Sequence, residues 1–208
     1  ILMNYLLTNW IAIASLIISC LTVTYTIIKN QINLELETTS EPQWGIALLY
    51  DDGKSSINDF GFLKTNIRII NSSNTDISFF DLAVIDSLSK EALHYYNQKQ
   101  THIFNELQNS KAIIMLDKDN EFQELNLPSG NSGIVKAHSL TSIDLVISPE
   151  SDIRELFIIF KVAQKKPLLN KIKLGYVDSA YKSFSLLIQV NKLSKPNFEE
   201  VYSSLNIE

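Results

Sequence analysis

The first 28 residues of this 208-residue chain carry no charged side chain, since all 18 Lys and Arg and all 23 Asp and Glu lie at or after Lys29. A transmembrane helix needs about 20 predominantly apolar residues to cross a hydrocarbon core of about 30 Å. The stretch from Tyr5 to Ile28 is long enough, and nine Ile, Leu or Val residues fall between Trp10 and Ile28. We therefore expect one membrane-spanning helix within residues 1–30.

Aromatic and basic residues indicate where this helix would meet the membrane surface. Trp10 and Tyr25 lie near its two ends, and amphipathic rings prefer the headgroup region. Lys29 is the only basic residue close to the span, which favours a cytoplasmic domain after it. We expect a single-pass protein of the cell membrane whose anchor residues are Trp10, Ile13, Ile17, Leu21, Tyr25, Ile28 and Lys29.

Two other interpretations of the apolar stretch fit less well. A cleaved signal peptide has a basic start, a shorter apolar core and a small-residue cleavage site, and the printed sequence offers none of these. A buried helix of a soluble protein is usually shorter and flanked by polar caps. The only cysteine, Cys20, lies inside the stretch, so the following domain has no internal disulfide.

From residue 31 onward the dominant period is two, which is typical of half-buried strands. Turn-prone segments such as 51–53 and 71–76 recur at short spacing. The predicted strands are 31–37, 44–50, 62–70, 77–85, 112–116, 142–147, 155–162, 171–177 and 183–190, the last two forming a hairpin. No strand longer than a dozen residues and no βαβ alternation is expected. The pattern predicts an all-β sandwich and excludes an α/β fold.

Only two segments offer a helix. Residues 89–107 keep a helical stripe but fit a hairpin equally well, so residues 88–108 are left open between the two. In residues 197–205, Phe198, Val201, Tyr202 and Leu205 share one helical face after Pro196. We expect this C-terminal helix to dock on the domain, in preference to serving as a short partner-binding motif.

Four segments together carry a resemblance to known proteins, namely 68–74, 79–81, 127–130 and 139–145. They resemble bacterial Ig-like or fibronectin-like sandwich domains. More specifically, the chain looks like uncharacterised single-pass membrane proteins of low-GC Gram-positive bacteria and their phages. The resemblance implies a fold and an anchor but no activity. The expected organisation is a transmembrane helix at 1–30, an Ig-like β-sandwich at 31–192 and a C-terminal tail with a short amphipathic helix at 193–208.

Motifs that would carry chemistry are weak. Residues 117–121 resemble the start of a calcium loop, but Phe122 and Pro128 stand where that loop needs Gly and Glu. Residues 130–133 lack the Lys of a phosphate loop. Three histidines, not spaced as a metal pair, are interpreted as structural: His94, His102 and His138. We expect no enzyme activity, no metal, no cofactor and no small-molecule substrate.

Charge gives one further candidate site. The net charge of −5 argues against a nucleic-acid-binding protein. The local basic cluster around residues 161–173 could meet anionic lipid headgroups or nucleic acid. Its candidate lipid or partner contacts are Lys165, Lys166 and Lys171. A solvated loop between two strands is the favoured interpretation of the same residues.

Two functional hypotheses follow from this organisation. The first is a membrane-anchored, non-enzymatic binding or adaptor module that presents the sandwich to an unknown protein partner through loops or a strand edge. The alternative is a membrane-acting, toxin-like effector whose helix oligomerises while the β domain acts as sensor. The alternative depends on a hydroxyl-rich face of the span formed by Ser15, Ser19 and Thr22, with Thr26 next.

Overall fold

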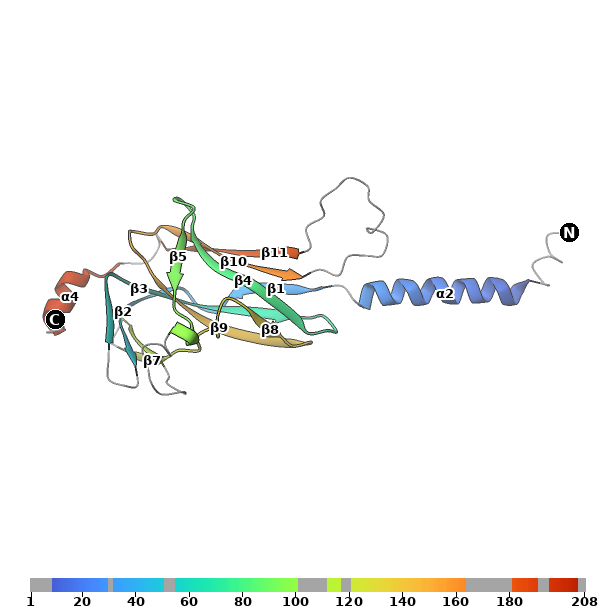
Figure 1. Ribbon diagram of the computed structural model, residues 1–208, viewed down its shortest axis with the longest axis horizontal. Helices are drawn as coiled ribbons and strands as arrows, with labels where there is room; N and C mark the ends of the chain where they lie inside the picture. Colours follow the sequence, from blue (N-terminus) through green and yellow to red (C-terminus); the bar gives the residue numbers. More distant parts are fainter. Residues whose placement is uncertain are drawn as a thin grey trace.

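A computed structural model of the chain describes residues 9–29, 32–50, 55–100, 112–116, 121–163, 181–190 and 195–205. A long helix comes first, a β-rich domain follows, and a short helix comes last (Figure 1). The elements are α2 (Trp10–Lys29), β1 (Leu34–Thr38), β2 (Gln43–Tyr50), β3 (Ser55–Asn71), β4 (Ile77–Asp86), β5 (Ala92–Tyr95), β6 (Ala112–Leu116), β7 (Phe122–Glu124), β8 (Gly133–Val135), β9 (Ser139–Ser148), β10 (Glu155–Ala163), β11 (Tyr181–Gln189) and α4 (Phe198–Leu205).

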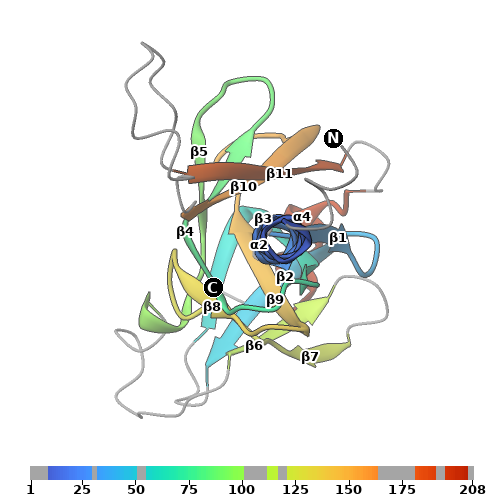
Figure 2. The ribbon, with the colours of Figure 1, turned by 90° about the vertical axis from the view of Figure 1, so that its right-hand side faces the viewer.

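The strands form one antiparallel sheet that folds over itself into a sandwich. Their order is β11-β10-β4-β5-β9-β3-β2-β6-β7, while β1 pairs with β3 and β8 with β4. Viewed from the α2 side, β10 and β11 lie in one layer above β3 and β9 in the other (Figure 2). The short strand β5 joins the layers, because Leu93 pairs with Val84 of β4 and His94 with Ser148 of β9. The all-β sandwich with an N-terminal apolar helix is therefore confirmed.

The core explains why the period-two segments became strands. Alternate side chains of β3, β4, β9 and β10 point between the layers, and Ile67, Val84, Leu145 and Ile158 are each fully buried. A second cluster lies on the other face of β2, β3 and β9, around Phe62 and in contact with the segment 125–127. Burial of apolar surface on this scale is the main contribution that stabilises such a domain.

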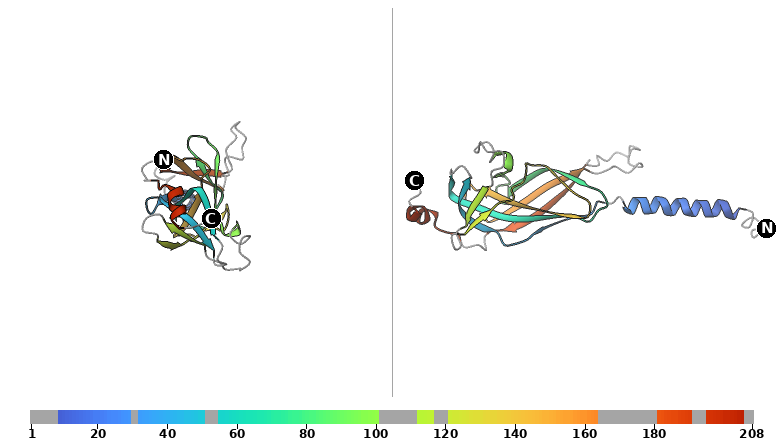
Figure 3. Two further views of the ribbon diagram at one scale, coloured as in Figure 1. Left: turned by 90° about the vertical axis from the view of Figure 1, so that its left-hand side faces the viewer. Right: turned by 90° about the horizontal axis from the view of Figure 1, so that it is seen from below.

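The strand register defines two ends of the sandwich. β1 begins where β3 ends, since Leu34 pairs with Asn71, and β9 begins at the same level, since Ser139 pairs with Asn71. The last residue of β10, Ala163, pairs with the first residue of β11, Tyr181. These two strand ends lie on the same side of the sandwich as α2 (Figure 1). We call this the helix end, because α2 extends away from it (Figure 3). We call the opposite end, where α4 lies, the far end.

Several predictions of extended structure need correction. β3 has 17 residues and starts at Ser55, seven residues before the prediction, so the expectation of no strand longer than a dozen residues was wrong. Ser56, Asn58 and Phe60 are partly buried on alternate positions of this extension, and Gly61 bends it with a φ of 73°. β7 and β8 were not predicted, because three residues show too little periodicity.

The segment 88–108, for which helix and hairpin were equally expected, contains both a strand and the start of a helix in its described part. Residues 92–95 are strand β5, whereas a helical turn begins at 98–100, where the side chains of Asn97 and Gln100 each accept the other's backbone N–H at 3.1 and 3.2 Å. This reciprocal pair is a capping box. The rest of the ambiguous region, 101–108, and the predicted strand 171–177 lie outside the described residues.

The C-terminal helix α4 docks on the far end, as predicted. Phe198 is buried against Trp44, with ring centroids 5.9 Å apart, and lies over Gly61, where a Cβ would overlap its ring. The Tyr202 hydroxyl lies 2.8 and 3.0 Å from the carbonyl oxygens of Asn58 and Ile46. Burial raises the pKa of Tyr202.

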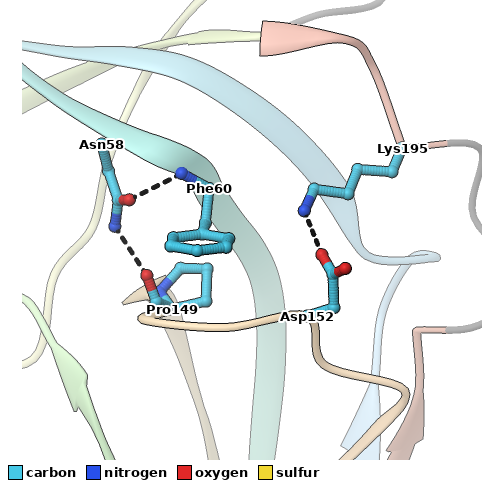
Figure 4. Close-up of polar contacts among 5 residues, drawn as sticks. All are labelled: Asn58, Phe60, Pro149, Asp152 and Lys195. Atoms are coloured by element: carbon cyan, nitrogen blue, oxygen red, sulfur yellow. Dashed lines mark hydrogen bonds and ion pairs between the residues drawn. The ribbon is translucent and has the colours of Figure 1, made fainter.

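Polar contacts fix the chain beside this helix (Figure 4). The Asn58 side chain donates to the Pro149 carbonyl at 2.9 Å and accepts the Phe60 N–H at 2.8 Å. Lys195, just before α4, forms an ion pair with Asp152 and lies over the Phe60 ring, 5.2 Å from its centroid. The far end of β3, the β9–β10 turn and the chain leading to α4 are thus joined into one unit.

Candidate functional site: the apolar helix, its junction and an open sheet edge

The helix α2 is exposed along its whole described length. Its 18 residues Trp10–Ile27 have a mean hydropathy of 1.9, and none of them is buried against the domain. At 1.5 Å per residue, the 20 residues of α2 extend about 30 Å, which matches a hydrocarbon core. The helix is therefore long and apolar enough to cross a membrane, and an exposed apolar surface of this size is costly in water.

The predicted anchor residues lie along one stripe of this helix. From Trp10 to Ile28, consecutive members are three or four residues apart, the spacing at which side chains share a helical face, and Lys29 directly follows the last of them. Those whose side chains are described are exposed or half-buried, namely Trp10, Ile13, Ile17, Leu21 and Tyr25. The last two, Ile28 and Lys29, belong to the helical backbone, which ends at Lys29.

Four of the hydroxyl groups of α2 are satisfied within the helix itself. Ser19, Thr22, Thr24 and Thr26 each donate to the carbonyl four residues earlier at 2.8 Å. This is the geometry expected of Ser and Thr in an apolar environment, and it removes the cost of leaving a hydroxyl without a partner there.

The junction between α2 and the sandwich is a network of hydrogen bonds, which we call the junction network. It starts at Asn33, four residues after the last residue of α2. The Asn33 N–H donates to the Ser73 hydroxyl at 2.7 Å, and the Asn33 carbonyl accepts the Ser72 N–H at 3.0 Å. The chain leaving the helix is thus tied to the turn 72–76 before β1 begins.

Asn71 is the centre of the junction network. Its side chain is 1% exposed, and Nδ2 lies 3.0, 3.1 and 2.9 Å from the carbonyl oxygens of Thr75, Val135 and Lys136. Its Oδ1 accepts the Ser73 N–H at 2.9 Å. Asn71 therefore holds together two loops that are more than 60 residues apart in the sequence.

Three further contacts fix the loop 136–138 to the turn 72–76. Asp76 accepts the Ala137 N–H at 2.8 Å, and the Ser73 carbonyl accepts the His138 N–H at 3.3 Å. The His138 ring lies 3.0 Å from the Asn74 side chain. The sequence predicted a turn at 71–76, but these long-range bonds left no signal in it. They also give His138 the structural role that was expected.

The predicted basic contact residues Lys165, Lys166 and Lys171 lie outside the described residues. The chain leaves β10 and enters β11 at the helix end, where a described cluster of aromatic and charged side chains lies. Lys161 pairs with Asp81 at 2.9 Å, which raises the pKa of the lysine, and its Nζ lies 4.8 Å from the centre of the Tyr181 ring.

The sandwich is open along one side, between β1 and β11. Among the described strands, β1 pairs only with β3 and β11 only with β10, so each has one edge without a strand neighbour. The core-facing residues Phe184, Leu186, Ile188 and Val190 lie on one face of β11 as predicted, and Leu187 on the other face is 45% exposed. A groove of about 550 Å³ lies where both strands end. It is lined by Thr38 of β1, by the turn residues Thr39, Ser40, Glu41 and Pro42, and by Leu187, Ile188 and Gln189 of β11.

Two buried ionisable groups elsewhere in the sandwich, Lys64 and Asp144, make polar contacts that hold the fold together. Lys64 is 5% exposed and donates to Gln123 at 2.5 Å; burial lowers its pKa, and the nearby Asp144 opposes that shift. Asp144 accepts the Asn126 N–H at 2.8 Å. Together these groups hold the segment 123–126 on the outer face of β3 and β9. Within the part of the chain that the structure describes, no group of three or more His, Cys, Asp or Glu could hold a metal.

Fold and site together define an all-β sandwich joined by a short, hydrogen-bonded junction to one helix long enough to cross a membrane. No family model, no curated protein and no solved structure matches the chain.

Proposed function

We propose that this chain is a membrane-anchored, non-enzymatic binding module. In this proposal α2 crosses the cell membrane once, and an Ig-like β-sandwich held at the membrane surface binds a protein partner through the open edge between β1 and β11. Lys29 at the end of the span favours the cytoplasmic side for the sandwich.

The observation that carries the proposal is the groove between β1 and β11. A strand edge presents a row of unpaired backbone N–H and C=O groups, which an extended peptide can use to add a strand. The groove adjoins the end of the β11 edge at the half-exposed Leu187, so backbone pairing along β11 and an apolar contact are available together. The apolar helix supports the anchoring part of the proposal, because nothing in the described domain covers it.

Site-specific crosslinking tests the binding edge in the full-length chain. A photoreactive residue is placed at Leu187 in the groove or, as a matched control, at Leu88, a 67% exposed leucine in the turn after β4. We expect a discrete crosslinked protein at Leu187 in native membranes and none at Leu88. The same pattern at both positions, or no product at Leu187, would contradict the proposal.

The alternative of an oligomerising effector makes a different prediction. Replacing Ser15, Ser19 and Thr22 with Leu would abolish toxicity on overexpression if close packing of that face caused it. Because the Ser19 and Thr22 hydroxyls already donate within their own helix, we expect the replacement to leave the protein's behaviour unchanged.

A further inference from the structure

The segment 134–140, which runs from β8 through the loop 136–138 into β9, exposes alternate residues at the helix end. Ile134 of β8 is 64% and Leu140 of β9 51% exposed, and Lys136 and His138 between them are exposed as well, whereas Val135 is buried. The segment therefore presents two apolar side chains on either side of a cation, without a carboxylate among them. Exposed Ile and Leu flanking Lys is a composition suited to the boundary between apolar chains and charged headgroups.

The position of this loop is fixed relative to α2. Asn33 lies four residue steps after Lys29, so the distance between them is at most about 14 Å. From Asn33 the junction network leads through Ser73 to His138 by hydrogen bonds of 2.7 and 3.3 Å. If α2 spans a bilayer, this short link keeps the loop close to the headgroup layer, which extends about 5–7 Å beyond the hydrocarbon core.

Other side chains at the helix end fit the same environment. Tyr181, at the start of β11, is 38% exposed, and the neighbouring Lys182 is exposed above the Phe184 ring. Two of the carboxylates at this end are engaged, Asp76 by the Ala137 N–H and Asp81 by Lys161. Glu35 is an exposed carboxylate of β1. The far end, by contrast, carries the exposed carboxylates of Glu150, Asp152, Glu199 and Glu200.

We propose that the helix end is a lipid-facing surface on which Ile134 and Leu140 contact the bilayer interface while Lys136 and Lys182 attract anionic headgroups. This inference rests on the proposed anchoring by α2 and assigns residues that the anchor alone does not require. The surface holds the sandwich in one orientation relative to the membrane. Each lysine near an anionic surface contributes about fivefold to local association.

Fluorescence quenching in vesicles tests this surface with the full-length chain. Cys20 is the only cysteine, so a Cys20→Ala background allows a fluorophore to be placed at Ile134→Cys, Leu140→Cys or, as the far-end control, Leu88→Cys. The proteins are reconstituted into phosphatidylcholine vesicles with and without a quarter of phosphatidylglycerol, and a shallow nitroxide lipid is the quencher. Wild-type protein labelled at Cys20, with a deep nitroxide lipid, reports on the anchor.

We expect strong quenching at 134 and 140, more in the anionic vesicles, and little at 88. Lys136→Glu with Lys182→Glu should reduce quenching severalfold in anionic vesicles, while the far-end control Lys90→Glu should not. Quenching at 134 and 140 equal to that at 88, with Cys20 quenched, overturns the lipid-facing surface and leaves the anchor intact. An unquenched Cys20 overturns the anchoring itself. Protection of 134 and 140 from an aqueous quencher without lipid quenching would assign the surface to a protein and also overturn the inference.

Discussion

Asn71→Ala should destabilise the sandwich far more than its place in a polar turn suggests. The two N–H protons on Nδ2 are shared among three carbonyl oxygens at 2.9 to 3.1 Å, and Oδ1 accepts one N–H at 2.9 Å. Counting one hydrogen bond for each proton that is donated or accepted, the substitution removes three hydrogen bonds at a residue that is 1% exposed. At about 1 kcal/mol each, the loss is about 3 kcal/mol, and buried carbonyl groups left without a donor add to it.

Thermal unfolding of the full-length protein in detergent measures this effect. The chain has two tryptophans, so Trp10→Phe leaves the buried Trp44 as the reporter. For a domain of this size, 3 kcal/mol corresponds to a fall in Tm of about 6–12 °C. Ser72→Ala, an exposed side chain in the same turn, is the control and should change Tm by less than about 2 °C. Equal, small effects of both variants would refute the role of Asn71 in the junction network.

Three further outcomes are expected. Gly61→Ala should lower Tm, because its φ of 73° costs a residue with a Cβ about 1–2 kcal/mol and the new Cβ would overlap the Phe198 ring. In Asp86→Asn, the free energy of unfolding should fall less steeply than in the wild type as the pH is lowered into the acid range. Burial alone would raise the pKa of Asp86, but hydrogen bonds from Leu88 and Ser89 outweigh it and lower the pKa, so the carboxylate stabilises the fold above about pH 4 and this contribution is lost as the pH falls further. Ile17→Arg should release the chain from membranes into alkaline carbonate, because a central Arg costs about 2.5–3.5 kcal/mol of insertion.

Each of these outcomes has a clear contrary result. An unchanged Tm for Gly61→Ala would mean that α4 does not pack where the structure has it. If stability fell with decreasing pH as steeply in Asp86→Asn as in the wild type, Asp86 would be excluded as a source of acid sensitivity. Full retention of Ile17→Arg in carbonate-washed membranes, with the conservative Ile17→Val also retained, would argue against a spanning α2.

Periodicity predicted the elements that are long and half-buried. The strands around Ile67, Val84, Leu145 and Ile158 follow from alternate apolar residues, and α4 follows from a four-residue apolar stripe. These patterns depend only on neighbours in the sequence, so one chain suffices to recognise them.

Contacts between distant segments could not be predicted in the same way. Asn71 has the composition of a turn residue, and nothing local reveals that it binds carbonyl groups 64 and 65 residues later. The hollow over Gly61 that receives Phe198, the joining of two layers by β5 and the groove between β1 and β11 likewise depend on how strands pair across the chain.

Reactivity of Cys20 in unsolubilised membranes tests the central claim most directly. Cys20 is exposed on α2, so only a bilayer or a partner can protect it, and the chain has no other cysteine to confuse the readout. We predict that a membrane-impermeant maleimide leaves Cys20 unmodified in intact or opened membranes and modifies it once detergent and denaturant are added. Ser203→Cys in a Cys20→Ala background, at the exposed far end, should react in opened membranes throughout. Rapid modification of Cys20 in opened membranes would contradict a membrane-spanning helix.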